Sequence, residues 1–222
     1  EPIEGTKCDG QIIVDIMNRM GYVQADYEPE SMLEEIAQIV PFFAGVKWNE
    51  LGDNGKQWPV KKDGSDTEIL HTETFTRGKG KFMFNAFKDS EEILQHGKEY
   101  PYIITTNREL EHYNCGAMTR RTRNVDILTE DVLLICEEDA RKHLINDGDM
   151  VCVESPRGKV DIKAKITDEV KPGILSSTFH FPDMMLNNIT SSISDSEAMC
   201  PEYKVVACNI RKSKGKYKNA LN

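Results

Sequence analysis

The chain has 222 residues, of which 39% are hydrophobic and 29% are charged, enough apolar material for a packed core and too much for general disorder. It contains no run of about 18 apolar residues, which excludes a membrane-spanning helix, and its net charge of −9 disfavours general nucleic-acid binding. Residues 1–8 lack the basic and apolar segments of a secretory signal, so we expect a cytoplasmic protein.

The acidic charge lies mainly in the first part of the chain. Residues 1–95 contain 18 acidic and 10 basic side chains, whereas residues 96–222 contain 19 and 18. Within the second part, Arg120, Arg121 and Arg123 form a local basic group. The second part is therefore compatible with a polyanionic small molecule as its ligand.

Two short amphipathic helices are predicted near the start of the chain. Asp9 is expected to cap the first helix, which ends at Gly21 and places its apolar residues on one stripe. The second helix is expected to open with Pro29 and the capping box Ser31-x-x-Glu34 and to end at Pro41. Two such helices cannot close a core by themselves.

The residues after these helices predict little regular structure. Residues 42–76 are rich in glycine and polar residues, which predicts a long ordered loop. Residues 81–87 alternate well enough to predict a strand, although no partner strand is evident nearby. We therefore interpret residues 1–95 as the C-terminal tail of an α/β domain that begins elsewhere.

The second part has the pattern of a closed sheet. Six segments rich in Ile, Val, Thr and aromatic residues predict short strands at 102–106, 132–136, 150–154, 160–166, 174–179 and 203–210. A helix is expected at 137–144, and Pro156-Arg157-Gly158 predicts a hairpin. Residues 96–222 are thus expected to form a β-barrel whose connecting loops carry the function.

The cysteines do not suggest a metal site. No Cys-x-x-Cys pair occurs, and no histidine stands at zinc-finger spacing from Cys8, Cys115, Cys136, Cys152, Cys200 or Cys208. Buried free thiols are the expected state.

The loop at residues 105–121, TTNRELEHYNCGAMTRR, mixes polar, basic and aromatic residues without a helical stripe. Arg108 can fork onto a phosphate or carboxylate, and Glu109 and Asn114 can hydrogen-bond a nucleobase. His112 and Tyr113 can stack or donate. The alternative is a solvated loop around a buried tyrosine.

This loop resembles the opening of the C-terminal domain of molybdopterin-guanine-dinucleotide oxidoreductases, the dimethyl sulfoxide reductase superfamily. Further stretches resemble formate dehydrogenases of that superfamily, namely residues 11–22, 39–46, 55–60, 145–149, 155–158, 179–190 and 201–204. The implied fold class is α+β, a double-psi-like β-barrel preceded by the C-terminal piece of an α/β domain.

The resemblance also implies a function. The chain would be the cofactor-binding C-terminal portion of a formate dehydrogenase, binding bis-molybdopterin guanine dinucleotide with Mo or W. The implied cofactor-binding residues are Thr106, Arg108, Glu109, His112, Asn114, Thr119, His180, Asn187, Tyr203 and Lys204. Arg108 and Lys204 would neutralise the charge of the cofactor, and Glu109 and Asn187 would hydrogen-bond the guanine. The pterin side would be contacted by His112, Tyr203 and His180.

The family's metal-ligating Cys or selenocysteine and its 4Fe-4S cysteines have no counterpart in this sequence. The resemblance therefore places the catalytic ligand, the cluster and the partner subunits for electron transfer outside this chain, which would be inactive alone. Two alternatives remain open. The chain could belong to an enzyme acting on nitrate, polysulfide or arsenate, or it could be a stand-alone double-psi barrel binding module.

Overall fold

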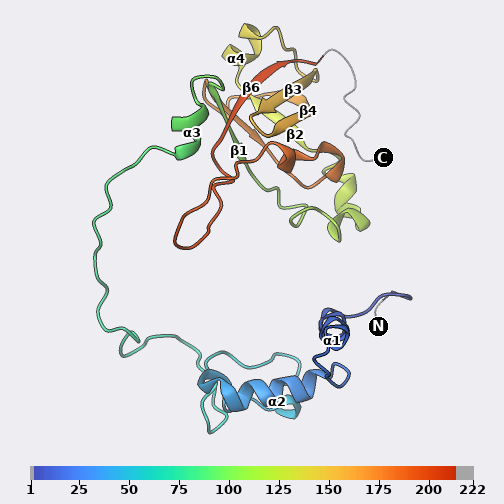
Figure 1. Ribbon diagram of the computed structural model, residues 1–222, viewed down its shortest axis with the longest axis vertical. Helices are drawn as coiled ribbons and strands as arrows, with labels where there is room; N and C mark the ends of the chain where they lie inside the picture. Colours follow the sequence, from blue (N-terminus) through green and yellow to red (C-terminus); the bar gives the residue numbers. More distant parts are fainter. Residues whose placement is uncertain (1–2, 214–222) are drawn as a thin grey trace. The chain divides into compact units, whose positions relative to one another are not determined.

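The computed structural model describes residues 3–213 and divides the chain into two compact units, Glu1–Phe84 and Asn85–Asn222 (Figure 1). The boundary expected from the sequence, between residues 95 and 96, lies later in the chain than this division between Phe84 and Asn85. The helix α3 (Glu91–His96) falls in the second unit because it contacts the last strand of the barrel. No helix among residues 3–213 is long and apolar enough to cross a membrane.

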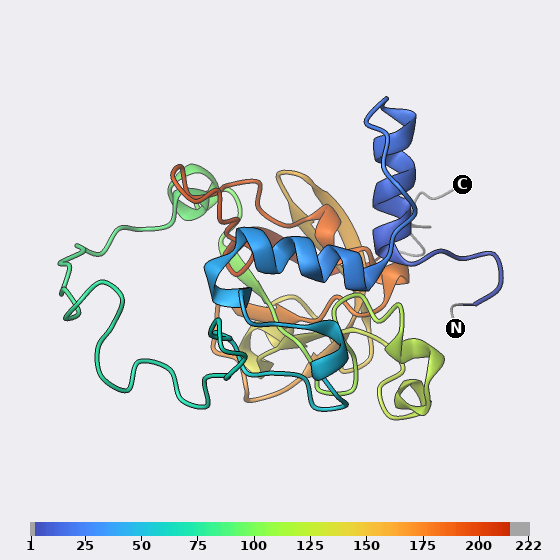
Figure 2. The ribbon, with the colours of Figure 1, turned by 90° about the horizontal axis from the view of Figure 1, so that it is seen from below.

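The described part of the first unit contains two α-helices, α1 (Asp9–Arg19) and α2 (Pro29–Ile39), whose axes point in clearly different directions (Figure 2). Both predicted N-caps are wrong. Cys8 precedes α1, and Asp9 lies in the first turn, where its charge suits the positive end of the helix dipole. Pro29 starts α2 as predicted, since proline fits the first helical position, but Ser31 lies within the first turn and does not cap it.

The remainder of the first unit is held by turns. Short 3-10 turns lie at Pro41–Phe43 and Trp48–Glu50, and its buried apolar residues are Val14, Val46 and Val60. The strand predicted at residues 81–87 does not form. Among residues 3–213 no strand pairs with this segment, and Phe82, Phe84 and Phe87 are exposed.

The second unit is a closed six-stranded barrel with the strand order β1-β5-β2-β4-β3-β6. Its strands are β1 (Tyr102–Thr106), β2 (Val132–Ile135), β3 (Met150–Ser155), β4 (Gly158–Ile166), β5 (Ile174–Ser177) and β6 (Val206–Lys212). β1 pairs with β5 and β2 with β4 in parallel, and the other pairs are antiparallel. The predicted barrel is confirmed, although β6 begins three residues later than expected.

The barrel encloses the core. Alternate residues of each strand point inward and pack against one another, including Ile104, Leu133, Ile162 and Leu175. The helix α4 (Glu137–Lys142) buries Ala140 against this cluster. A closed sheet leaves no free edge, so the loops at its two ends are the places left for a ligand.

The cysteines are all free, but the prediction that they are buried is only half correct. Cys136, Cys152 and Cys208 are buried, whereas the other three are exposed, because they lie before α1 or in surface loops. Burial raises the pKa of the Cys208 thiol to about 12, so this side chain stays a protonated apolar filler.

Candidate functional site

A pocket of 440 Å³ lies where two neighbouring strands of the barrel end. β1 and β5 are parallel and adjacent, and Thr106 at the end of β1 is in register with Ser177 at the end of β5. The loops that follow both strands therefore start at the same end of the barrel. The pocket is lined by Thr106, Arg108, Phe179, Asn187, Thr190 and Tyr203.

Four of the predicted site residues thus line one pocket. The guanidinium carbon of Arg108 lies 5.8 Å from the centre of the Phe179 ring, which supports the charged group by a cation–π contact. Among the described residues, no carboxylate lies within ion-pair distance of Arg108. Its hydrogen-bond donors are therefore available to an anion.

Lys204 and Glu109 contact other parts of the same region. Lys204 Nζ donates to the carbonyl of Thr106 and so holds the end of β1. The Glu109 side chain borders a separate hollow of 30 Å³ together with Asn107 and Thr178. That hollow has room for about one water molecule, and Glu109 is not among the residues that line the 440 Å³ pocket.

His180 is fully buried and joins the loop after β1 to the segment after β5. The backbone N–H of Glu109 donates to Nε2 at 3.0 Å, so this nitrogen is an acceptor. Nδ1 lies 2.5 Å from the carbonyl oxygen of Asn114, which can only accept, so Nδ1 carries the proton. The ring holds both ends of the turn at residues 109–114 and does not line the 440 Å³ pocket.

His112 supports the same loop and is also buried. Its Nε2 donates to the carbonyl of Leu128 at 2.9 Å, and its Nδ1 lies 3.0 Å from the hydroxyl oxygen of Thr119. That hydroxyl also accepts from the N–H of Tyr113 at 3.2 Å. The polar atoms of His112 and Thr119 are therefore used in hydrogen bonds within the chain. Both residues were predicted to bind the cofactor, but neither lines the 440 Å³ pocket.

Gly116 allows this loop to turn tightly. Its φ of +67° is a conformation that L side chains rarely adopt. A Cβ at this position would lie 2.7 Å from the carbonyl oxygen of His180, which is too close. Glycine is therefore required where the loop passes directly over the buried histidine.

Asp131 is a buried carboxylate that the sequence analysis missed. Its oxygens accept from the N–H of His180 at 3.1 Å, from the N–H of Phe181 at 2.8 Å and from the hydroxyl of Thr178 at 2.5 Å. It therefore fixes the backbone that presents Phe179 to the pocket. An aspartate directly before an apolar strand was the only signal available in the sequence.

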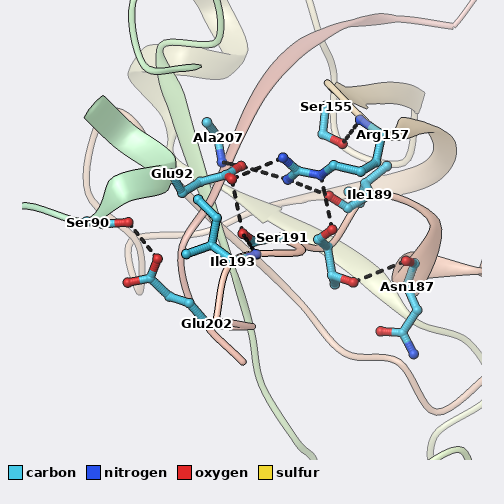
Figure 3. Close-up of polar contacts among 11 residues, drawn as sticks. Ser90, Glu92, Ser155, Arg157, Asn187, Ile189, Ser191, Ile193, Glu202 and Ala207 are labelled. Atoms are coloured by element: carbon cyan, nitrogen blue, oxygen red, sulfur yellow. Dashed lines mark hydrogen bonds and ion pairs between the residues drawn. The ribbon is translucent and has the colours of Figure 1, made fainter. Parts of the chain in front are cut away.

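Glu92 and Arg157 form a second buried ionic network that the sequence analysis missed (Figure 3). Arg157 Nη1 and Nη2 donate to the two carboxylate oxygens at 3.0 and 2.6 Å. Each oxygen accepts one further bond, from the Ser191 hydroxyl at 3.0 Å and from the N–H of Ala207 at 3.0 Å. The network joins α3, the β3–β4 hairpin, the segment before residue 193 and β6.

This network predicts a pH dependence of stability. Burial alone would raise the pKa of Glu92, but its bonds from Arg157, Ala207 and Ser191 hold the pKa below the ordinary value of 4.5. A lowered pKa stabilises the folded state at pH above 4.5, and this contribution is lost as the pH falls through the lowered pKa. The difference in free energy of unfolding between wild type and Glu92→Gln, measured by urea titration, should therefore shrink as the pH falls from 4.5 through the lowered pKa of Glu92. A constant difference down to complete acid unfolding would contradict this expectation.

Comparison with known proteins identifies the barrel. Residues 102–207 match the family described as Molydopterin dinucleotide binding domain. The chain is 36% identical over 210 residues to the F420-dependent formate dehydrogenase 2 subunit alpha of Methanococcus maripaludis, covering 92% of this chain and 31% of that protein. It is 34% identical over 211 residues to the probable oxidoreductase YjgC of Bacillus subtilis, covering 92% of this chain and 21% of that protein.

The fold has a solved relative. The acetylene hydratase from Pelobacter acetylenicus superposes with a TM-score of 0.60 at 16% identity, covering 96% of this chain and 34% of that chain. At this identity the likeness concerns the fold alone. The chain spans about a third of the length of the formate dehydrogenase subunits that it matches.

The pocket suits the ligand that the family description names. A pterin dinucleotide carries a diphosphate and polar rings, and the pocket offers an Arg108 guanidinium without an ion-pair partner in the described chain, hydroxyl groups and the Asn187 amide. All of the predicted site residues lie inside the matched range. The comparisons thus confirm the predicted resemblance: residues 102–207 match the molybdopterin dinucleotide-binding domain family, and the chain is similar to part of formate dehydrogenase alpha subunits.

Proposed function

We propose that the second unit binds molybdopterin guanine dinucleotide in the 440 Å³ pocket. The observation that carries this proposal is the meeting of β1 and β5, whose adjacent ends lead Arg108 and Asn187 to one pocket. Arg108 would bind the diphosphate as a charged fork, and Asn187 would hydrogen-bond the guanine. Tyr203 would line the pterin side.

The other predicted residues would act around this pocket. The Thr106 hydroxyl, which donates to the carbonyl oxygen of Tyr203 at 3.5 Å, would accept a hydrogen bond from the ligand, while Lys204 would add positive charge and hold the end of β1. Glu109 and Asn114 would contribute through the turn that His180 fixes. Thr119 would act indirectly, through its bonds to His112 and Tyr113.

We further propose that the chain serves an oxidoreductase that interconverts formate and CO2. A bis-dinucleotide Mo or W centre, when bound, would supply the two-electron chemistry. The residues of this chain would bind the dinucleotide, orient it and neutralise its charge. Because the relatives are named as alpha subunits, we expect electron-transfer partner subunits, and a 4Fe-4S cluster would be held outside this sequence.

The first unit would then be the tail of the central α/β domain of such a protein. Its buried apolar residues are few, and α1 exposes Ile12, Ile13 and Ile16. Helices with exposed apolar stripes need a larger partner to bury them. The six free cysteines are also consistent with a reducing compartment such as the cytoplasm.

Replacement of Arg108 by alanine tests the proposed pocket. A charge-assisted hydrogen bond to a phosphate contributes roughly 1.5–3 kcal/mol, so GDP should bind the Arg108→Ala chain about 10- to 150-fold more weakly than the wild-type chain in calorimetric titrations. Arg123→Ala is the matched control, because Arg123 has the same charge and is exposed like Arg108 but does not line the pocket. If both variants lose the same GDP affinity, the effect of Arg108 is general electrostatic attraction. If Arg108→Ala loses no affinity, Arg108 is not part of the site.

The 222-residue chain alone is expected to show no formate oxidation. The sequence has no Cys-His dipeptide and no four-cysteine cluster spacing, and the described residues contain no group of three side chains able to hold a metal ion. Viologen-linked formate oxidation by a preparation free of other subunits would contradict this expectation.

A further inference from the structure

One wall of the 440 Å³ pocket is formed by a segment that belongs to no strand. Asn187 and Thr190 come from residues 182–191, which contain only the 3-10 turns Pro182–Met184 and Leu186–Asn188. Met185 between these turns has a left-handed backbone with φ of 49°. Without a sheet ladder, the position of this segment depends on side chains that bind its backbone.

Arg157 binds that backbone. Its Nε donates to the carbonyl oxygen of Thr190 at 3.1 Å, and its Nη2 donates to the carbonyl oxygen of Ile189 at 3.1 Å. The Thr190 hydroxyl donates in turn to the carbonyl oxygen of Asn187 at 3.1 Å (Figure 3). The Arg157 guanidinium therefore binds Ile189 and Thr190 directly, through their carbonyl oxygens. It is connected to Asn187 through the hydroxyl group of Thr190.

The hairpin that carries Arg157 lies directly against this segment. A Cβ on Gly158 would lie 2.9 Å from the carbonyl oxygen of Asn188, so only glycine permits the approach. The N–H of Arg157 donates to the Ser155 hydroxyl at 3.2 Å, which shapes the turn. The run Ser155-Pro156-Arg157-Gly158 thus delivers a guanidinium to the outside of the pocket wall.

Glu92 sets the orientation of that guanidinium. The fully buried carboxylate binds it at two points, and its remaining acceptor sites are used by Ser191 and Ala207. A planar fork held at two points on one edge presents its other donors in a fixed direction. Glu92 comes from α3, which precedes the range matched by the family.

We propose that Glu92 and Arg157 are positioning residues for the ligand pocket, acting through Asn187 and Thr190. The inference rests on the proposed function for the identity of the ligand, but the hold on residues 186–191 is a property of the chain itself. It follows that the functional binding module includes α3 and begins before Tyr102. Neither residue lines the pocket.

A double-mutant cycle with GDP tests this proposal on the 222-residue chain. Arg157→Lys keeps the charge but cannot bind the carboxylate and both carbonyls together. Loss of one neutral hydrogen bond corresponds to roughly a tenfold change in affinity at most, so Arg157→Lys and Asn187→Ala should each weaken GDP binding by up to about that factor. Their double variant should bind little more weakly than either single variant, whereas Arg157→Lys and Arg108→Ala should combine multiplicatively.

The control is Asp139→Asn in α4. Asp139 is also a buried carboxylate, bonded to the N–H of Gly173 at 2.7 Å and to the Cys136 thiol at 3.3 Å, and it does not line the pocket. The Asp139→Asn variant should have a lower melting temperature than wild type but the same GDP affinity. Glu92→Gln replaces Arg157→Lys if the lysine variant does not fold. Multiplicative losses for Arg157→Lys with Asn187→Ala, or unchanged affinity in Arg157→Lys, would overturn the proposal.

Hydrogen exchange separates this inference from the proposed function. Backbone amides of residues 186–191 should exchange faster in Arg157→Lys than in wild type, and should be unaffected in Asp139→Asn. If wild type does not bind GDP, the proposed ligand is wrong, and the exchange data alone decide the positioning role. Unchanged exchange in Arg157→Lys would then reject it.

Discussion

The Arg157→Met variant is expected to lose about 3–5 kcal/mol of the free energy of unfolding of the second unit, because it leaves the Glu92 carboxylate buried without its counter-ion. The variant also releases the carbonyls of Ile189 and Thr190. Urea unfolding followed by far-UV circular dichroism measures this change. The midpoint should fall while the slope with denaturant stays constant.

The double variant Glu92→Leu/Arg157→Met is the informative control. Replacing both partners of a buried ion pair by apolar residues often restores stability, because no charge is left unpaired. The double variant should therefore be more stable than Arg157→Met alone. If the single variant loses less than about 1 kcal/mol, the ion pair behaves as an exposed pair would, and the network is not the support described above.

The Asp131→Ala variant is expected to lose about 3 kcal/mol or more, since it removes the acceptor of three buried donors and each unsatisfied donor costs roughly 1–3 kcal/mol. Those donors are the N–H groups of His180 and Phe181 and the hydroxyl of Thr178. Thermal and urea unfolding measure the loss. Hydrogen exchange at residues 178–181 should rise together with it, because this segment is the part released.

Asp126→Ala is the matched control for that variant. Asp126 is exposed, and its ion pair with Arg123 spans 3.9 Å. Surface substitutions of this kind usually change stability by no more than about 0.5 kcal/mol. A loss in Asp131→Ala that is no larger than the loss in Asp126→Ala would show that the Asp131 network does not hold the pocket-facing segment.

The two networks support different segments of the lining of the 440 Å³ pocket. Asp131 and His180 fix the loop after β1 and the start of the segment after β5, while Glu92 and Arg157 fix the end of that segment. Arg108 and Asn187 therefore each depend on side chains that do not line the pocket themselves. Asp131 and His180 support the loop that carries Arg108, and Glu92 and Arg157 support the segment that carries Asn187. Such supports keep a binding site in one conformation before the ligand arrives.

The sequence by itself determined the elements of the barrel. Its six strands were predictable because alternating β-branched and apolar residues are a local pattern, and glycine and proline mark the turns between them. Arg108, Asn187 and Tyr203 were predicted as site residues because the stretches that contain them resemble a known family, and in the structure they line one pocket. Local pattern failed where no partner existed, as at residues 81–87, which have strand-like alternation but no neighbouring strand.

Only the tertiary structure decided which predicted residues share a pocket and which ones support it. Glu92 and Arg157 are 65 positions apart, and Glu109 and His180 are 71 apart. Contacts at such separations leave no periodic signal in the sequence, because they depend on the closure of the barrel and on the direction of each loop. A histidine and a threonine in a polar loop look like ligand contacts from composition alone. In the folded chain, the bonds of His112, Thr119 and His180 are made to the chain itself, since buried polar groups must find partners there.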